Sequence, residues 1–163
     1  MLEIRHLSYQ VSGDGGGELD ILNDVSLTIP DHKFVVVTGP NGGGKTTLAK
    51  TIMGLAVPTG GQILWNGEDV TALSITERAK RGISYGFQQP GGEVKRIEIA
   101  TILARNSGLM IFDEPEAGID LWSFARLTET FRQLHDERGA TLVVISHQER
   151  IIDLADEIVV ISG

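Results

Sequence analysis

The residues with the clearest chemical meaning form a glycine-rich run from Gly39 to Thr46, which reads GPNGGGKT and has the spacing G-x-x-x-x-G-K-[ST]. An apolar, β-branched segment at 33–39 precedes it and a segment of helical period at 46–55 follows it, which is the context in which this spacing binds phosphate. Glycines let successive backbone N–H groups point inward, and the following helix adds its positive N-terminal end. We therefore predict that Lys45 reaches the β- and γ-phosphates of a nucleotide and that the Thr46 hydroxyl binds Mg²⁺. The predicted nucleotide-binding residues of this segment are Gly39, Asn41, Gly42, Gly43, Gly44, Lys45, Thr46 and Thr47.

Two acidic residues follow an apolar run in the segment LMIFDE at 109–114. The four apolar residues predict a buried strand that places Asp113 and Glu114 at its carboxyl end, where open α/β sheets have their ligand sites. Asp113 is predicted to hold Mg²⁺, directly or through water. Glu114 is predicted to polarise the attacking water as a general base. The alternative is that both acids only end a strand.

The rest of the chain alternates segments typical of strands with segments typical of helices. Strands are predicted at 2–11, 21–29, 33–39, 61–67, 68–71, 82–87, 109–114, 140–146 and 157–162, with a loop at 13–20. Helices are predicted at 46–55, 75–81, 92–106, 120–138 and from Ser146 to near Ala155, and the pairs Ser74/Glu77 and Ser146/Glu149 have capping-box spacing. Buried strands alternating with helices predict a parallel sheet covered on both faces, and the first strands predict a smaller antiparallel layer.

Composition narrows the classes of protein that the chain can belong to. It has 163 residues, 20 glycines, no cysteine and a formal charge of −8, which fits one globular domain with its own core. The absence of cysteine excludes disulfides and thiolate metal sites, and the negative charge argues against a broad nucleic-acid-binding face. No apolar run approaches the ~20 residues of a membrane span. We therefore expect a cytoplasmic protein without direct membrane insertion and without nucleic acid as a partner.

Taken together, these motifs resemble the nucleotide-binding domain of ABC-type ATPases, and the resemblance covers nearly the whole chain. GPNGGGKTT is similar to the Walker A loop, and LMIFDE is similar to Walker B with its catalytic glutamate. The resemblance implies that Gln88, in a Q-loop position, contacts Mg²⁺ and the attacking water, and that His147, in a switch-histidine position, contacts the γ-phosphate. It also implies that Tyr9 stacks on adenine. Asp120, in the D-loop-like EAGID, is implied to lie at a dimer interface, with helix capping as its alternative role.

The fold implied by the resemblance is α/β: a P-loop NTPase core with a mostly parallel sheet flanked by helices and a small antiparallel β layer. The implied reaction is hydrolysis of ATP to ADP and phosphate, with ATP or ADP and Mg²⁺ as the bound groups. The implied catalytic residues are Glu114, His147 and Gln88, and the implied metal ligands are Thr46, Gln88 and Asp113. A single ATP-binding core domain is expected over residues 1–163.

Within the family, the segments GGEVKRIEIA, FDEPEAGID and ISHQERI most resemble the Suf-type ATPases of iron–sulfur cluster assembly. That resemblance implies a cluster-assembly scaffold as the partner of the parent protein. The alternative is the ATPase subunit of an ABC transporter, whose partner is a permease.

One segment departs from the family pattern. The family has a helical subdomain between the Q-loop and the signature sequence, whereas QQPGGE at 88–93 joins the two directly, so the subdomain is absent between about 89 and 92. Pro90 stands where the signature has serine, and it offers neither a hydroxyl nor a backbone N–H. We therefore expect partner docking to be lost, the chain to be monomeric and turnover to be strongly impaired. The deletion is interpreted as engineered, with a natural deletion or missing sequence as the alternatives.

Two functions of different classes follow from these residues. The first is an enzyme, a minimised ABC ATPase core that binds Mg²⁺-ATP and hydrolyses it weakly. The second is a non-enzymatic scaffold that binds nucleotide without significant turnover. Phosphate release, compared between the wild-type chain and Glu114→Gln, distinguishes the two.

Overall fold

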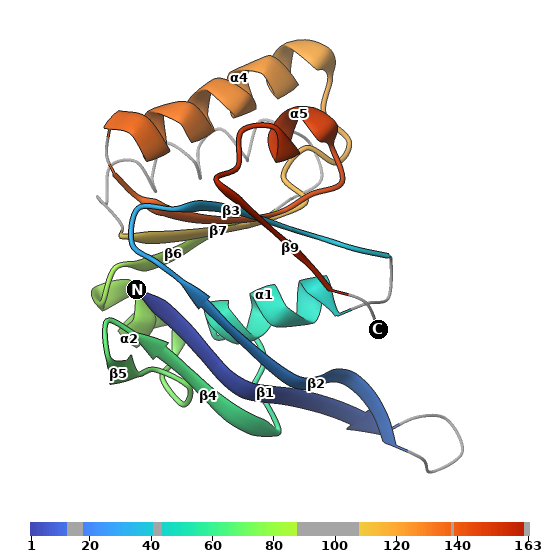
Figure 1. Cartoon of the computed structure of the whole chain (residues 1–163), viewed down its shortest axis with the longest axis vertical. Coiled ribbons are helices and arrows are strands. Elements are labelled where there is room, and N and C mark those ends of the chain that lie inside the picture. The colour runs from blue at the N-terminus through green and yellow to red at the C-terminus, as the bar shows by residue number, and fades with distance from the viewer. Residues whose placement is uncertain (13–17, 41–43, 88–107, 138, 162–163) are drawn as a thin grey trace.

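Two β-sheets, one parallel and one antiparallel, enclose the helix α1 (Lys45–Met53) (Figure 1). The structure is a computed structural model that describes residues 1–12, 18–40, 44–87, 108–137 and 139–161. The predicted helix at 92–106 lies outside the described residues, as do the loop residues at 41–43. The arrangement confirms the predicted α/β fold, with a parallel sheet and an additional antiparallel layer.

The parallel sheet places the functional segments at one edge. Its strands, in spatial order, are β6 (Ile83–Phe87), β7 (Leu109–Asp113), β8 (Thr141–Ile145), β3 (Phe34–Thr38) and β9 (Glu157–Val160). The register pairs Asp113 with Ile145 and Ile145 with Val37. Because the strands are parallel, the loops that follow β7, β8 and β3 therefore start next to one another.

The strand β3 illustrates why these short apolar segments fold as buried strands. Val35 and Val37 pack into the core shared with α1 and the antiparallel layer, whereas Phe34 and Val36 pack into a second core under the helices of the opposite face. All four side chains are at most 1% exposed. A strand that is buried on both faces has no polar alternation, and each such side chain contributes about 1.5–3 kcal/mol on burial. The strand that leads into the glycine-rich loop is therefore held in place by packing on both of its faces.

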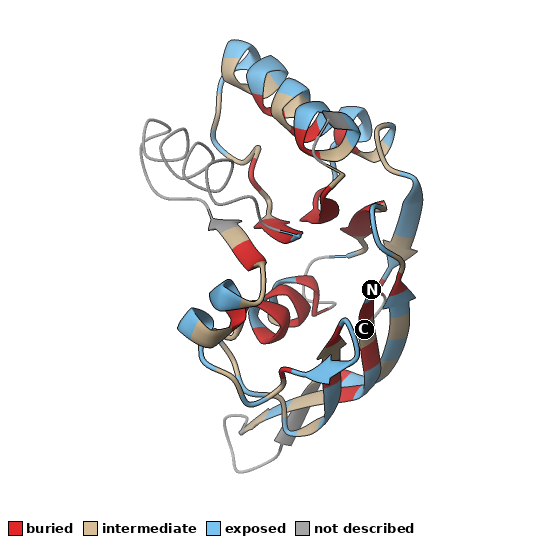
Figure 2. Cartoon of the chain, turned by 90° about the vertical axis from the view of Figure 1, so that its left-hand side faces the viewer, coloured by how far each residue is buried: buried red, intermediate tan, exposed pale blue. Residues whose placement is uncertain are grey.

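Two helical segments cover the second core. The predicted helix at 120–138 is confirmed as α4 (Leu121–Arg132), which continues as the π-helical turn η1 (Gln133–Glu137). Asp120 caps it, because its Oδ1 accepts a 2.7 Å hydrogen bond from the Ser123 N–H. The last predicted helix is shorter than expected, since α5 spans only Glu149–Ile152. Figure 2 shows the inner side of α4 buried and its outer side exposed.

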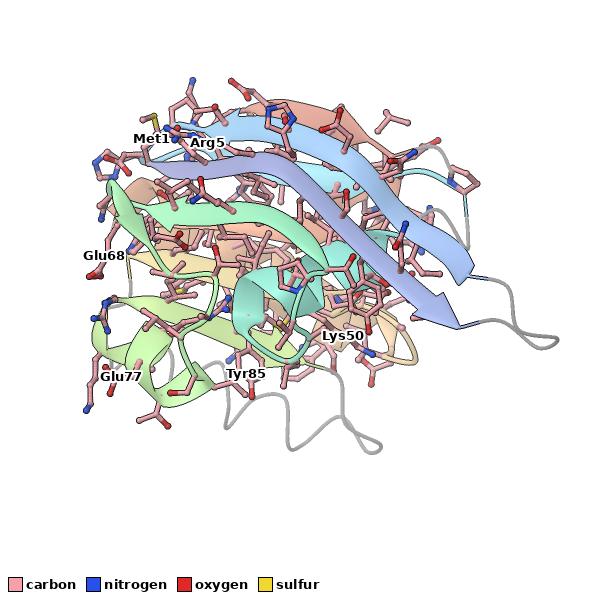
Figure 3. The ribbon with its side chains drawn as sticks, turned by 90° about the horizontal axis from the view of Figure 1, so that it is seen from below. Met1, Arg5, Lys50, Glu68, Glu77 and Tyr85 are labelled. Carbon is pink, nitrogen blue, oxygen red and sulfur yellow. The ribbon has the colours of Figure 1, made fainter. Side chains whose placement is uncertain are left out.

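The antiparallel layer has the strand order β2 (Glu18–Ile29), β1 (Leu2–Ser12), β4 (Gly60–Trp65) and β5 (Glu68–Asp69). Figure 3 views this layer from below together with α1, to which the labelled Lys50 belongs. The strand β2 begins at Glu18, three residues before the predicted start at residue 21. The reason is that the ladder with β1 extends to the pair Ser12–Glu18, a tertiary contact that the local sequence GDGGGELD does not signal.

The helix α2 (Ile75–Lys80) joins the antiparallel layer to α1. Its predicted N-cap is confirmed, because the Ser74 hydroxyl accepts a 3.2 Å hydrogen bond from the Glu77 N–H. Its Arg78 side chain is only 2% exposed. The guanidinium donates to the carbonyls of Thr51 (2.6 Å), Ile52 (2.8 Å), Thr71 (2.8 Å) and Leu73 (3.0 Å).

Candidate functional site

The glycine-rich loop starts and ends at two glycines whose conformations are strained for any other residue. Gly39 has a φ of 138° and Gly44 a φ of 94°. A Cβ at Gly39 would overlap the carbonyl oxygen of Ile161, and a Cβ at Gly44 would lie 2.6 Å from the carbonyl oxygen of Ile21. The loop therefore fits between β2 and the end of β9 only with glycine at both positions. Asn41, Gly42 and Gly43 lie outside the described residues.

Lys45 begins α1 and turns its ammonium back onto the loop. Its Nζ donates hydrogen bonds to the carbonyl oxygens of Gly39 (2.7 Å) and Pro40 (2.9 Å), and the residue is 5% exposed. An ammonium has three N–H donors, so these bonds use two of them. Thr46 and Thr47 follow in the first turn of α1, whose N–H groups form the positive end of the helix.

Asp113 is the last residue of β7, and its carboxylate is a group that can bind a hard cation. Its Oδ1 is buried and has no hydrogen-bond partner among the described residues. Burial, followed by the charge of Glu114, raises the pKa of Asp113, and a hydrogen bond from the Thr46 side chain together with the charges of Lys50 and Lys45 partly offsets this. A carboxylate and a hydroxyl side by side are oxygen ligands of the type that Mg²⁺ prefers. Thr46 and Asp113 therefore fit the predicted metal site.

Glu114 and His147 meet at the same edge of the sheet. Glu114 has a left-handed φ of 45°, and its N–H donates a 2.9 Å hydrogen bond to the carbonyl of Ile145. The His147 Nε2 lies 3.7 Å from the Glu114 Oε1, and both side chains are partly exposed. A non-glycine residue in this conformation costs roughly 1–3 kcal/mol, and such strain clusters at active sites. The structure therefore brings the predicted general base and the predicted switch histidine together.

The segment before His147 differs from the predicted capping box. The Ser146 hydroxyl donates a 2.7 Å hydrogen bond to the Glu116 Oε1 and accepts a 3.0 Å bond from the Gln148 N–H. The N-cap of α5 is Gln148, which makes no side-chain cap hydrogen bond. Ser146 and Glu149 therefore do not form a capping box, because a tertiary partner takes the serine hydroxyl. Glu116 is not among the residues predicted from the sequence, where its only signal is its place in EAGID, two residues after Glu114.

Tyr9 lies on β1 at the border of the main core, where it is partly buried. Its cross-strand partner is Leu22, and a Cβ at Gly44 would lie 2.8 Å from Leu22 Cδ2. Tyr9 is therefore one cross-strand neighbour away from the phosphate-loop end of α1. Gln88, the remaining predicted site residue, lies outside the described residues.

Two hollows flank His147. One has a volume of about 500 Å³ and is lined by Thr38, Gly39, Pro40, His147 and Val160. The other has a volume of about 630 Å³ and is lined by Glu116, Ile119, Asp120, Leu121, Phe124, His147, Gln148, Glu149 and Arg150. Volumes in this range are typical of small-molecule sites, and the first hollow adjoins the glycine-rich loop.

Among the helices of the described residues, none has the length and apolar character that a membrane span needs.

Sequence profiles match the two halves of the chain. The profile described as ABC transporter matches residues 22–91, and the profile described as AAA domain, putative AbiEii toxin, Type IV TA system, matches residues 91–153. The chain is 32% identical over 199 residues to an uncharacterized ABC transporter ATP-binding protein, MJ0035, of Methanocaldococcus jannaschii, a match that covers 87% of this chain and 79% of that protein.

A second relative is the sulfate/thiosulfate import ATP-binding protein CysA of Synechocystis sp., at 30% identity over 90% of this chain and 55% of that protein. The chain thus spans about half of CysA and most of the archaeal protein. These relatives are described as transporter ATPases and not as iron–sulfur assembly ATPases. Their descriptions do not support the Suf-type assignment, and they favour the transporter alternative.

Solved structures have the same fold. The dimeric post-hydrolysis structure of the ATP-binding cassette MJ0796 with ADP and phosphate has a TM-score of 0.83 at 20% identity, covering 99% of this chain and 94% of that one. The ADP conformation of MJ1267, an ATP-binding cassette of an ABC transporter, has a TM-score of 0.87 at 19% identity, covering 99% and 87%. At 20% and 19% identity, the two solved structures show only that the fold is shared. The sequence match to MJ0035 is closer, at 32% identity, and it extends over most of both chains. This match shows that the chain belongs to the family of ABC transporter ATP-binding proteins.

Proposed function

We propose that this chain binds Mg²⁺-ATP as a single cassette core and hydrolyses it slowly. The observation that carries the proposal is the convergence of three loops at one sheet edge. They bring the Lys45 ammonium, the Thr46–Asp113 pair and the Glu114–His147 pair to the same place. Each of these groups has a separate task in phosphoryl transfer.

The phosphate chain is proposed to lie across the glycine-rich loop and the start of α1. Lys45 would donate its third N–H to a phosphate oxygen, and the helix N-terminus would add backbone donors. Thr46 and Asp113 would hold Mg²⁺, with Gln88 as the further predicted ligand. The bound Mg²⁺ supplies positive charge that neutralises the phosphate oxygens.

Glu114 is proposed as the general base and His147 as the group that contacts the γ-phosphate. Water attacks the γ-phosphorus, Glu114 accepts a proton from that water, and the bond from γ-phosphorus to the bridging oxygen breaks to give ADP and phosphate. The 3.7 Å separation of Glu114 and His147 would let both side chains act on the same γ-phosphate. Tyr9 is proposed to stack on the adenine, a contact that accepts any flat ring.

A missing helical subdomain is part of the proposal. The match to the archaeal relative runs over 199 positions, although 87% of this chain is about 142 residues, so roughly 57 positions are occupied only in the relative. The two family profiles meet at residue 91, which agrees with a deletion between about 89 and 92. The parent protein is proposed to be a transporter ATPase, whose permease-docking surface would have been reduced by this loss. The non-enzymatic nucleotide-binding scaffold remains the second candidate, because Pro90 alters the signature segment.

Nucleotide binding is tested by thermal denaturation with and without Mg²⁺-ATP. A ligand at 100 times its dissociation constant adds about 2.7 kcal/mol, which for this size should raise the melting temperature by roughly 5–10 °C. Lys45→Ala should remove most of the shift, whereas Lys80→Ala, an exposed lysine paired with Glu77, should retain it. An unchanged melting curve in the wild-type chain contradicts binding.

Hydrolysis is tested separately by phosphate release. The wild-type chain should release phosphate slowly and Glu114→Gln should not. Tyr9→Ala should weaken ATP binding several-fold while Tyr9→Trp retains it. Equal phosphate release from the wild-type chain and Glu114→Gln would favour the non-enzymatic scaffold.

A further inference from the structure

A buried hydrogen bond ties the loop after β7 to the loop after β8. Ser146 is fully buried, and its hydroxyl donates to the Glu116 Oε1 at 2.7 Å while accepting from the Gln148 N–H at 3.0 Å. A hydroxyl bond to a carboxylate is charge-assisted and stronger than a neutral one. Since the Ser146 N–H also donates to the carbonyl of Val37 at 3.2 Å, the backbone is held on both sides of His147.

The imidazole of His147 has no comparable anchor of its own. The side chain is 44% exposed, and its one ring interaction within the described part of the chain is with Glu114 at 3.7 Å, which is too long for a hydrogen bond. The position of the ring is therefore set mainly by the main chain at 146–148. Any shift of Ser146 is transmitted directly to His147.

Glu116 makes this bond at an energetic cost. Its Oε2 is buried and has no hydrogen-bond partner among the described residues, and a buried polar atom without a partner is destabilising. The bond to Ser146 needs only the acceptor atom Oε1, which a glutamine side chain also provides. Glu116→Gln is therefore a matched variant that keeps the acceptor and removes the charge.

From this geometry we infer that Glu116 is a positioning residue that fixes His147 at the γ-phosphate through the hydroxyl of Ser146. The inference rests on the proposed function, because it assigns the placement of a side chain in that same site. Glu116 itself does not touch the reacting atoms. It holds the loop on which the reacting group is mounted, and it links that loop to the turn that leads into α4.

The kinetic test is a double-mutant cycle on ATP hydrolysis by the full chain. Glu116→Leu and Ser146→Ala should each lower kcat about tenfold and change KM less than twofold, since misplacing a reacting group lowers the rate more than binding. The double variant should be no slower than the slower single variant, because both substitutions break one bond. Glu116→Gln should retain kcat within about twofold. Melting curves confirm that each variant is still folded at the temperature of the assay.

A spectroscopic test does not require turnover. The ring signal of His147 in the NMR spectrum of histidine-labelled protein is identified by its loss in His147→Gln. It should move in Glu116→Leu and Ser146→Ala, and it should stay in place in Glu116→Gln. The control is Glu129→Gln, an exposed acid on α4 that lines neither hollow beside His147, which should leave the signal unchanged.

The two tests separate the inference from the proposed function. Absence of phosphate release from the wild-type chain overturns hydrolysis, and the His147 signal then still decides the positioning role. An unmoved signal in both Glu116→Leu and Ser146→Ala overturns the positioning role whatever the turnover. So does additive loss of kcat in the double variant, or a loss in Glu116→Gln as large as that in Glu116→Leu.

Discussion

The proposed metal site needs Asp113 in its charged form, whereas the stability of the fold favours the protonated form. Burial and the charge of Glu114 raise the pKa of its carboxyl group, so the folded chain holds this proton more tightly than the unfolded chain does. The charged form therefore costs stability at neutral pH, and the cost disappears as the pH falls through the raised pKa. This cost is consistent with the proposed role of the Asp113 carboxylate as a ligand of a cation.

We expect Asp113→Asn to melt roughly 2–4 °C above the wild-type chain at pH 7 without nucleotide, the shift that ~1 kcal/mol gives in a domain of this size. The difference should shrink as the pH is lowered, and stabilisation by Mg²⁺-ATP should be lost. Calorimetry across a pH series measures both effects, with the exposed Asp153→Asn as the control. A variant less stable than the wild-type chain at pH 7 would show that the buried carboxylate is already compensated.

Gly44 is required both by its backbone conformation and by its neighbours. Its φ of 94° is strained for other residues, and a Cβ would press on the carbonyl oxygen of Ile21 at 2.6 Å. Gly67 has a similar φ of 83°, but a Cβ there would meet nothing within 4 Å, so it isolates the conformational cost. Comparing substitutions at Gly44 and Gly67 therefore separates the cost of the left-handed backbone from the cost of the clash with Ile21.

We expect Gly44→Ala to lower the free energy of unfolding by on the order of 3 kcal/mol, from the combined costs of a left-handed backbone and overpacking. Gly67→Ala should lower it by only about 1 kcal/mol. Urea denaturation measures both. Equal losses in the two variants would mean that β2 moves away from Gly44 at no cost.

At the scale of elements, the orientation of α1 depends on a residue distant in sequence. Arg78 of α2 donates to two carbonyls at the carboxyl end of α1 and to two carbonyls in the segment between β5 and α2. Burial lowers the pKa of Arg78, but four carbonyl acceptors solvate the cation. The helix α1, which begins at the proposed phosphate site, is thus fixed at its far end by the segment between β5 and α2 and by α2 itself.

We expect Arg78→Leu to cost on the order of 3 kcal/mol in unfolding free energy, because several charge-assisted hydrogen bonds are lost and buried carbonyls are left without a donor. Arg81→Leu should cost far less, since the Arg81 side chain is 33% exposed and pairs with Glu68 and Glu77, which are exposed by 50% and 44%. Chemical denaturation of both variants tests the contrast. Similar losses would show that water replaces the guanidinium of Arg78.

At the scale of the whole molecule, the family resemblance implies that turnover depends on whether a second chain completes the site. The resemblance aligns Pro90 with the serine of the signature sequence. Proline has no hydroxyl or N–H to offer, and one lost preorganised donor costs about 10²–10³-fold in rate. We therefore expect very slow hydrolysis with a specific activity that does not depend on protein concentration. Light scattering of Glu114→Gln with ATP should report a monomer. Activity that rises cooperatively with concentration, together with an ATP-dependent dimer, would show that the shortened segment acts in trans.

The sequence by itself determined the parts of this protein that depend on local spacing. GPNGGGKT between an apolar strand and a helix predicts a phosphate loop, and LMIFDE predicts a strand that ends in two acids. Both strands are confirmed, because residues buried on both faces leave a continuous apolar run that no other element explains as well. The caps at Ser74 and Asp120 are also confirmed, since a cap is a contact over three residues.

Only the tertiary structure decided the contacts between segments far apart in the chain. Ser146 and Glu149 have the spacing of a capping box, yet the serine hydroxyl bonds Glu116, thirty residues earlier. Likewise, the long ladder of β1 with β2 sets the start of β2 at Glu18, and the fold buries Arg78 against α1. A side chain with several available partners takes the one that the packed fold brings within reach, and sequence spacing does not contain that distance.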